Sequence, residues 1–593
     1  MAAVQSLFAH LAARRFFPVP VIYLIGGTDM ATHGLTGRNG GQILMQQLKI
    51  HGTRRIFMVP GESYLPCIDA LNEHREAIEP IVCRQESGAA YMAEAYGKLT
   101  GEPGVCFVTR GPGASNASIG VHTAYQDSTP MILFIGQVGS DFMEREAFQE
   151  IDYRRMFGPM CKWVAQIDRT DRIPEFIARA YSVATSGRPG PVVLALPEDT
   201  LWGVSEVEDA PKYQRKHTYP GAPDMHAFME HLDQAQRPVM IVGGSGWTSE
   251  AIAQVQDFAQ RAAIPVGTSW RRLECFDQAH PNAAGHVGWG MDQAWQQRIE
   301  NADLIIALGT RLGEETTLGY TLLKAPVANQ SLVHVYPDAD ELGRVYAPSL
   351  AIVSGVQGFA SALAACEPKS ASARQHYVEA AHAEYLASLQ PLPCEGPLNL
   401  DALAAHVNST IGPEACLTVG AGNYALYPHR YRQFRRLGTS LAPTVGSMGY
   451  GLPAALSAKL ENRDQTVVCY AGDGCFQMTM QELGVALQYR LGIVILLFNN
   501  GVWGTIRAHQ EREYPGRAIA LDFVNPDFTR IVQGYDGYGE IVDRTEQFAA
   551  AFERALEFAQ AHDLPALLDI RYDPNVIAPG ETLQAIRERA LQS

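Results

Sequence analysis

The sequence predicts an α/β protein with three domains, each built on a doubly wound parallel sheet. Short apolar runs typical of strands alternate with helical patterns along the whole chain, an order that favours parallel sheets covered by helices. Two polar stretches that contain proline, 212–223 and 391–397, divide the chain into three such units. The chain has 593 residues, which is too long for a single hydrophobic core.

The strand-like runs follow one another within these units. In the first unit they cover 55–59, 81–83, 105–109, 131–135 and 192–196. In the second they cover 239–242, 304–308 and 332–335, and in the third 466–471, 493–498 and 566–570. We expect a disordered N-terminal extension over 1–34 and domains over 35–210, 224–385 and 398–593.

The composition is that of an ordinary globular protein, with 47% hydrophobic and 19% charged residues. A net charge of −16 disfavours a nucleic-acid partner, which needs a basic face. No apolar run approaches the roughly 20 residues that span a bilayer. The ten cysteines include no Cys-x-x-Cys pair, so neither a disulfide framework nor a zinc site is indicated. We therefore expect a cytoplasmic protein that binds neither nucleic acid nor membrane.

The most informative stretch begins at Gly472 and ends at Asn500. Asp473 and Asn500 lie 500 − 473 = 27 residues apart, and each follows a strand-like run. A strand–helix–strand crossover of this length makes the two strands parallel, so both side chains reach the same edge of the sheet. Carboxylate and amide oxygens suit Mg²⁺ or Ca²⁺, and Mg²⁺ usually keeps phosphate oxygens as further ligands. Gly-Asp-Gly at 472–474 or Asn-Asn at 499–500 would more often be a turn if it stood alone. At this spacing the two motifs together predict a metal-bridged diphosphate site.

This stretch resembles the signature of thiamine-diphosphate (ThDP) enzymes, in which Gly-Asp-Gly is followed after about two dozen residues by Asn-Asn. The resemblance implies Mg²⁺ bound by Asp473, Asn500 and the main-chain carbonyl of Val502. The helix that starts near Asp473 would face the diphosphate, since helix N-termini favour anions. The implied cofactor contacts are Asn423, Gly446, Met448, Gly472, Gly474 and Cys475.

Met448 lies in the stretch 446–453, which is similar to the family segment that supports the bent cofactor. By the same resemblance, Met448 would lie beneath ThDP and the Gly446 carbonyl would accept a hydrogen bond from its N4′ amine. Taken alone, a methionine here would be ordinary core.

A second stretch, 81–101, places Glu86 at the start of a helix. An acidic residue there usually only complements the helix dipole. The residues around it, however, resemble the segment that carries the catalytic glutamate of ThDP enzymes: Glu86, Ala89, Met92, Ala93, Tyr96, Thr100 and Gly101. In that family the glutamate hydrogen-bonds N1′ of the aminopyrimidine, which lets N4′ take the C2 proton, and this needs a raised carboxyl pKa. The resemblance implies that Glu86 activates the cofactor.

Three further segments, 111–116, 148–150 and 187–191, are similar to the acetolactate synthase branch (acetohydroxyacid synthase large subunits). The resemblance extends from about residue 35 to 575. It implies that Gln149 lies near the reacting carbonyl and that Gly61 lines the same cleft. It also implies pyrimidine-binding, central and diphosphate-binding domains, with ThDP between two chains of a homodimer or homotetramer.

Several positions depart from the pattern of that branch. Glu315 stands where an arginine holds the second keto acid's carboxylate, which a glutamate would repel. His509 replaces the tryptophan that selects the larger keto acid, and Glu198 replaces a lysine. The Met-His-Gly contact to FAD is Trp-Gly-Met at 289–291, although Arg311 remains, so FAD binding stays open.

We therefore expect a ThDP- and Mg²⁺-dependent transferase or lyase, an acetolactate synthase-like carboligase or decarboxylase that acts on a 2-keto acid. An acyloin or 2-hydroxyacyl lyase, or a decarboxylase with an uncharged acceptor, would fit Glu315 better. A non-catalytic ThDP-binding homologue would be free to lose Glu86 or Asn500, and both are present. A nicotinamide-dependent oxidoreductase would need Gly-x-Gly-x-x-Gly after 239–242, where the glycines are spaced differently.

Overall fold

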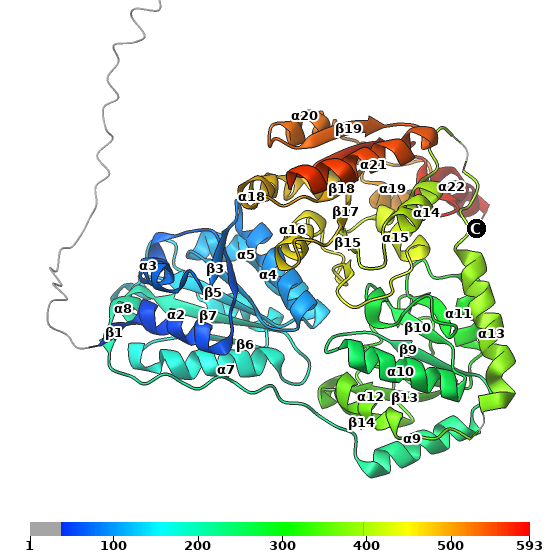
Figure 1. The fold of residues 1–593 in the computed structure, drawn as a ribbon, viewed down its shortest axis with the longest axis horizontal. Helices are drawn as coiled ribbons and strands as arrows, with labels where there is room; N and C mark the ends of the chain where they lie inside the picture. The colour runs from blue at the N-terminus through cyan, green and yellow to red at the C-terminus, as the bar shows by residue number, and fades with distance from the viewer. Residues whose placement is uncertain (1–36, 370, 395, 593) are drawn as a thin grey trace, which may run out of the picture. The chain divides into compact units, whose positions relative to one another are not determined.

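The computed structural model describes residues 37–369, 371–394 and 396–592 (Figure 1). The N-terminal extension expected over 1–34 lies outside these residues. The described chain contains three six-stranded sheets in which every pair of neighbouring strands is parallel, and helices follow the strands in each. The prediction of three α/β domains with parallel sheets is therefore confirmed. Within the described ranges, no helix is long and apolar enough to cross a membrane.

The N-terminal sheet has the strand order β3-β2-β4-β5-β7-β6. Its strands are β2 (Arg55–Met58), β3 (Glu79–Val82), β4 (Gly104–Val108), β5 (Met131–Gln137), β6 (Trp163–Gln166) and β7 (Pro191–Pro197). Its helices are α2 (Gly40–His51), α3 (Leu65–His74), α4 (Glu86–Thr100), α5 (Gly111–Asp127), α6 (Tyr153–Phe157), α7 (Ile173–Thr185) and α8 (Glu198–Trp202). A short ladder pairs β1 (Arg38–Asn39) with β8 (Val204–Ser205). The inner strands β4, β5 and β7 are buried throughout, which explains their uninterrupted apolar runs.

The central sheet has the order β11-β10-β9-β12-β13-β14. Its strands are β9 (Pro238–Val242), β10 (Val266–Ser269), β11 (Ala283–Val287), β12 (Leu304–Leu308), β13 (Ser331–Tyr336) and β14 (Leu350–Val353). Its helices are α9 (Ala222–Gln234), α10 (Ser249–Ala262), α11 (Gln293–Glu300), α12 (Val356–Ala364) and α13 (Ala371–Ser388).

The C-terminal sheet has the order β16-β15-β17-β18-β20-β19. Its strands are β15 (Cys416–Val419), β16 (Ser440–Leu441), β17 (Val467–Gly472), β18 (Val494–Asn499), β19 (Tyr538–Val542) and β20 (Ala566–Arg571), and a hairpin of β21 (Val576–Ala578) and β22 (Glu581–Thr582) follows. The helices are α14 (Leu400–Thr410), α15 (Leu426–Tyr431), α16 (Gly451–Glu461), α17 (Asp473–Gln477), α18 (Leu483–Tyr489), α19 (Gly504–Glu513), α20 (Phe528–Gln533), α21 (Thr545–His562) and α22 (Leu583–Gln592). The neighbours β17 and β18 are parallel, so their carboxyl ends lie at the same edge, as the crossover argument predicts.

The N-terminal and C-terminal domains share one buried hydrophobic core where α4 packs on α16. The shared core includes small side chains from both helices, among them Ala89, Ala93, Ala454 and Ala458. They let the two helices approach closely enough for the Ser457 hydroxyl to donate to a main-chain carbonyl of α4 at 2.9 Å. This contact places α4 beside the C-terminal domain of its own chain.

Candidate active site

A cleft of about 260 Å³ opens at the carboxyl ends of β17 and β18. Its walls also include residues that follow β15 and the hairpin β21–β22. All nine residues that the sequence assigns to the metal or the cofactor in this domain line it: Asn423, Gly446, Met448, Gly472, Asp473, Gly474, Cys475, Asn500 and Val502.

Asp473 is buried at the first position of α17, directly after β17. Its Oδ1 accepts a hydrogen bond from the main-chain N–H of Gly474 (2.8 Å). Its Oδ2 accepts bonds from the N–H of Gly501 (2.8 Å) and Asn500 (3.2 Å) and from Asn525 Nδ2 (2.7 Å). Burial raises the pKa of the Asp473 carboxyl above its ordinary value, although these donors act to lower it. A cation bound beside Asp473 would favour its charged form.

Asn525 was not predicted from the sequence. Its Nδ2 donates to Asp473 and to Asn499 Oδ1 (2.8 Å), and its Oδ1 accepts from Gln477 Nε2 (3.0 Å). It therefore fixes the orientation of the Asp473 carboxylate. No local pattern marks it, because it lies in an irregular segment whose role depends on contacts more than 20 residues away.

Glycines allow the backbone around Asp473 to approach two aromatic rings. A Cβ at Gly474 would lie 2.4 Å from the ring of Trp503, and one at Gly472 would lie 2.7 Å from the ring of Tyr424. Both separations are too short for any side chain, so this part of the cleft requires glycine.

The segment 442–450, which carries Gly446 and Met448, is held by the N-terminal domain of the same chain. The Tyr91 hydroxyl on α4 contacts Ser447 Oγ (2.6 Å) and donates to the Met448 carbonyl (3.0 Å). Asp127, at the end of α5, accepts from the main-chain N–H of Thr444 (2.8 Å). The cleft wall at Met448 thus depends on side chains more than 300 residues away in sequence.

A buried cluster of charges reinforces this contact. The Lys98 ammonium lies between Glu94 (3.2 Å) and Asp127, and it donates to the Ala442 carbonyl (2.8 Å). The Tyr450 hydroxyl donates to Glu94 at 2.5 Å. Burial raises the pKa of the Glu94 carboxyl, and the charge of Lys98 opposes this rise. Buried charges persist only when they are paired in this way.

Glu86, Gly61 and Gln149 gather in the N-terminal domain instead. Glu86 Oε2 accepts from Asn116 Nδ2 on α5 at 2.8 Å. A Cβ on Gly113 would lie 3.5 Å from Glu86 Oε1 and 3.1 Å from Thr109, whose side chain also borders Gly61. The Gln149 carbonyl accepts from the N–H of Gly111 at 2.9 Å, and Gln149 Oε1 is buried with no partner among the described residues.

Glu86 is not among the residues that line the cleft around Asp473. A single chain therefore carries two half-sites, one around Glu86 and one around Asp473. Glu482, just after α17, lies near the first of them: its carboxylate accepts from the N–H of Gln85 (3.0 Å) and of Arg84. Burial raises the pKa of Glu482 to about 7, and the charge of Glu86 adds to this rise.

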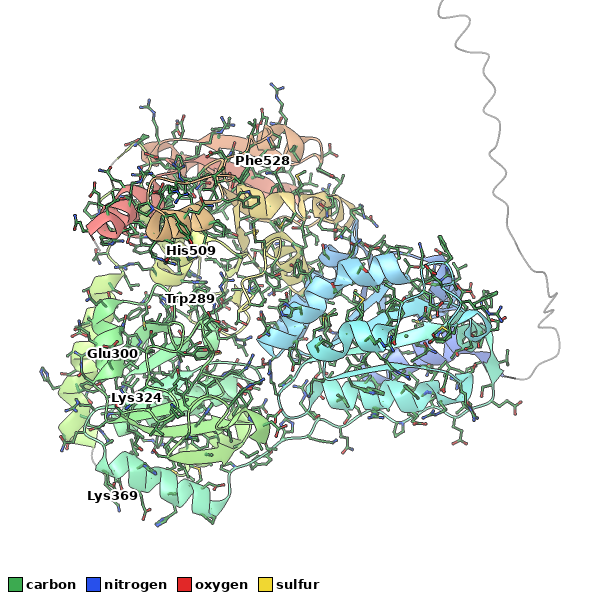
Figure 2. The ribbon with its side chains drawn as sticks, turned by 180° about the vertical axis from the view of Figure 1, so that it is seen from behind. Trp289, Glu300, Lys324, Lys369, His509 and Phe528 are labelled. Carbon is green, nitrogen blue, oxygen red and sulfur yellow. The ribbon has the colours of Figure 1, made fainter. Side chains whose placement is uncertain are left out.

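The positions that depart from the expected pattern do not line the cleft around Asp473. Glu315 lines a central-domain cavity of about 370 Å³, and burial raises its pKa. Glu198 pairs with Arg110. Figure 2 places Trp289 on the central domain and His509 on the C-terminal domain, where His509 belongs to α19.

Three parts of the chain match the domains of a known protein family. Residues 38–156 match the N-terminal TPP binding domain of thiamine pyrophosphate enzymes, 225–363 match their central domain and 420–570 their C-terminal TPP binding domain. The chain is 30% identical over 569 residues to the acetolactate synthase isozyme 1 large subunit of Escherichia coli (strain K12), covering 92% of this chain and 96% of that protein. The chain belongs to the thiamine pyrophosphate enzyme family.

A second relative supports the same branch. The acetolactate synthase large subunit of Lactococcus lactis is 33% identical over 511 residues, covering 84% of this chain and 87% of that protein. The resemblance drawn from the sequence motifs is therefore confirmed, and the protein is an acetolactate synthase-like, ThDP-dependent enzyme. Both half-sites fall inside matched TPP binding domains, Glu86 in the N-terminal one and Asp473 in the C-terminal one.

Proposed function

We propose that this ThDP-dependent carboligase or decarboxylase uses Mg²⁺ and acts on a 2-keto acid. The observation that carries the proposal is the cleft in which Asp473, Asn500 and Val502 lie together at the ends of two adjacent parallel strands. One carboxylate, one amide and one main-chain carbonyl form a hard oxygen set that suits Mg²⁺ and leaves positions open for diphosphate oxygens. When bound, ThDP would supply the electron sink for breaking or forming a bond at the carbonyl carbon.

The residues of the N-terminal half-site would then handle protons and orient the substrate. Glu86 would hold a proton for the aminopyrimidine ring, with its carboxylate oriented by Asn116. The Gln149 amide would donate through Nε2 to a substrate oxygen, while its Oε1, which is buried without a protein partner among the described residues, would accept from a donor on the ligand. Gly61 would leave room for the substrate beside Thr109.

We propose that each complete site forms between two chains, in a homodimer or homotetramer. Within one chain Glu86 does not line the cleft of Asp473. Large apolar side chains are exposed next to both half-sites: Leu65, Ile119 and Phe148 near the first, and Met478 and Ile506 near the second. A second chain would cover such surface, which a single chain leaves in contact with water.

FAD is not part of the proposed reaction, because the central-domain cavity fits a nucleotide poorly. Three arginines line the cavity, Arg272, Arg311 and Arg344, but three carboxylates, Asp127, Glu314 and Glu315, line it as well, so the lining has no net positive charge. Glu314 and Glu315 line the same cavity and would repel a pyrophosphate. A visible absorption spectrum of the purified protein without flavin bands is the expected result.

We also propose the domain borders 35–210, 224–385 and 398–593. Each of these ranges encloses one six-stranded sheet, which supports the division. A cytoplasmic location is proposed as well. It is consistent with the lack of any disulfide among the described residues.

The decisive experiment supplies the purified protein with ThDP, Mg²⁺ and a panel of 2-keto acids, with and without aldehydes. Carbon dioxide release and acyloin or acetohydroxy-acid formation are measured. We expect release of carbon dioxide from at least one keto acid, with loss of turnover but retained ThDP binding in Glu86→Gln. Full activity of Glu86→Gln would refute the role of Glu86, and no turnover of any keto acid would refute the proposed substrate class.

A further inference from the structure

A second and larger cavity, of about 500 Å³, adjoins the ThDP cleft. Asn423 and Thr505 line both spaces, and the Thr505 hydroxyl donates to Asn423 Oδ1 at 3.0 Å. The remaining wall comes from α19 on one side and from β22 and α22 on the other: Ala508, His509, Arg512, Glu581, Ile586, Arg589 and Ala590. A ligand bound in this cavity could therefore extend toward the cofactor.

The two helices that form the cavity are joined by a double ion pair. Arg587 on α22 donates through Nε to Glu511 Oε2 on α19 (2.7 Å) and through a second nitrogen to Glu511 Oε1. Glu511 also accepts from the N–H of Gly516 (2.9 Å) and is buried. This bidentate contact holds α22 against α19, so the cavity has a defined wall.

The charged side chains that line the cavity are two arginines and one glutamate, which gives a formal excess of one positive charge. Arg589 pairs with Glu581 at 2.5 Å, and Arg512 lies beside Glu513 at 2.9 Å. A guanidinium has five N–H donors, so both arginines keep donors for a ligand.

His509 adds a further donor. A nitrogen of Arg512 lies 2.8 Å from His509 Nδ1, and because a guanidinium can only donate, Nδ1 must accept. The neutral ring then carries its proton on Nε2. Burial, together with the charge of Arg512, lowers the pKa of His509, which favours this neutral form. The cavity wall thus combines an imidazole N–H with two guanidinium groups.

We propose that this cavity binds the anionic group of the second substrate, a carbonyl compound that carries a carboxylate or a phosphate. The inference rests on the proposed function, because it assigns the acceptor for that same site. In the sequence pattern, Glu315 replaces the arginine expected to hold the acceptor's carboxylate. Arg512, Arg589 and His509 present donors in a cavity that adjoins the cofactor cleft, and their charge and donor groups suit an oxyanion.

Direct binding tests the site without turnover. Glycolate, which carries only a carboxylate, and glycerol 3-phosphate, which carries only a phosphate, are titrated calorimetrically into the holoenzyme; neither has a reactive carbonyl. We expect one of them to bind, and Arg512→Gln and Arg589→Gln each to weaken that binding about tenfold through the lost charge-assisted hydrogen bonds. The comparison of the two anions tells carboxylate from phosphate. Arg530→Gln serves as the matched control, because Arg530 is exposed on α20 and pairs with Asp527.

The lysine variants Arg512→Lys and Arg589→Lys keep the charge and should recover part of the affinity. If neither anion binds the wild-type protein, or if both glutamine variants bind as tightly as Arg530→Gln, the proposal is overturned. This result does not depend on catalysis, so it stands apart from the keto-acid panel that tests the proposed function.

Acceptor choice is the second readout. With a donor from that panel, kcat/KM is measured for glyoxylate, which is charged, and for acetaldehyde, which is not. The ratio of glyoxylate to acetaldehyde should fall about tenfold in Arg512→Gln and in Arg589→Gln and stay constant in Arg530→Gln. An unchanged ratio in both glutamine variants would contradict an anion site in this cavity.

Discussion

At the scale of single residues, the proposed metal site depends on the orientation of the Asp473 carboxylate as well as on the presence of an aspartate at this position. Four N–H donors surround its carboxylate, and one of them, Asn525 Nδ2, comes from a side chain. The three main-chain donors follow from the fold around β17 and β18. Asn525 is therefore the position where the geometry of the carboxylate can be perturbed without changing the proposed metal ligands.

We predict that Asn525→Ala weakens binding of Mg²⁺ in the presence of ThDP by about 10- to 100-fold, the usual effect of removing a group that orients a metal ligand. The apparent Kd for Mg²⁺, measured by calorimetric titration, checks this. Asn329→Ala, at an exposed position in the central domain, is the control. Equal Mg²⁺ affinity in the two variants would show that Asn525 does not orient Asp473.

Glu482 makes the stability depend on pH. Its folded pKa, about 7, lies above the ordinary carboxyl value of 4.5, so the folded state binds the proton more tightly than the unfolded state. The free energy of unfolding should therefore decrease as the pH rises from about 4.5 to about 7, by at most about 3 kcal/mol from this group.

Urea unfolding of the wild type and of Glu482→Gln across this range measures the effect. As the pH rises, the free energy of unfolding of Glu482→Gln should increase relative to that of the wild type, since the amide has no charge to bury. A difference that is independent of pH would rule out this assignment.

At the scale of secondary-structure elements, α4 serves both half-sites. Its first residue is Glu86, and further along it Tyr91 and Lys98 hold the segment 442–450 that carries Met448. The contact with α16 brings these side chains to the C-terminal domain of the same chain. A rigid helix can thus position the cleft wall in one domain while presenting Glu86 at its other end.

We predict that Lys98→Met destabilises the protein by about 3–5 kcal/mol, because it leaves Glu94 and Asp127 buried without their cation. Urea unfolding measures the loss. Lys49→Met, at an exposed position of α2, should change the stability little. If the two variants unfold alike, the Lys98 cluster does not hold the two domains together.

A comparison of the expected strands with the observed ones shows which strands can be recognised from the local sequence. Of the six edge strands, only β3 was expected. β6 and β19 include polar residues, and β14 is a run of only four apolar residues, most of them partly exposed. The inner strands β10 and β15 were also missed. β10 reads Val-Gly-Thr-Ser, which carries too little apolar character to be recognised.

At the scale of the whole molecule, we propose that a second chain completes each of the two half-sites. If Glu86 of one chain completes the cleft of another, a hybrid of two inactive variants regains one intact site. One chain would carry Glu86→Gln and the other Asp473→Asn. The intact site would combine Glu86 from the second chain with Asp473 from the first.

We predict that co-expressed Glu86→Gln and Asp473→Asn chains, purified through different tags, show about half of the wild-type activity in the isolated hybrid dimer. Each variant alone should be inactive. Sites formed within single chains would leave the hybrid as inactive as its parents, and that outcome would reject the arrangement between chains. Sedimentation of the wild type gives the size of the assembly.

The sequence alone determined the α/β class, the division into three sheets and the pairing of Asp473 with Asn500. The pairing could be predicted because a short right-handed crossover makes its two strands neighbours, so the geometry follows from local connectivity. The roles of Tyr91, Lys98 and Asn525 were decided only by tertiary structure, since these side chains meet partners that are remote in sequence. The same holds for the cavity between α19 and α22, because packing between segments, which no local pattern encodes, brings its charges together.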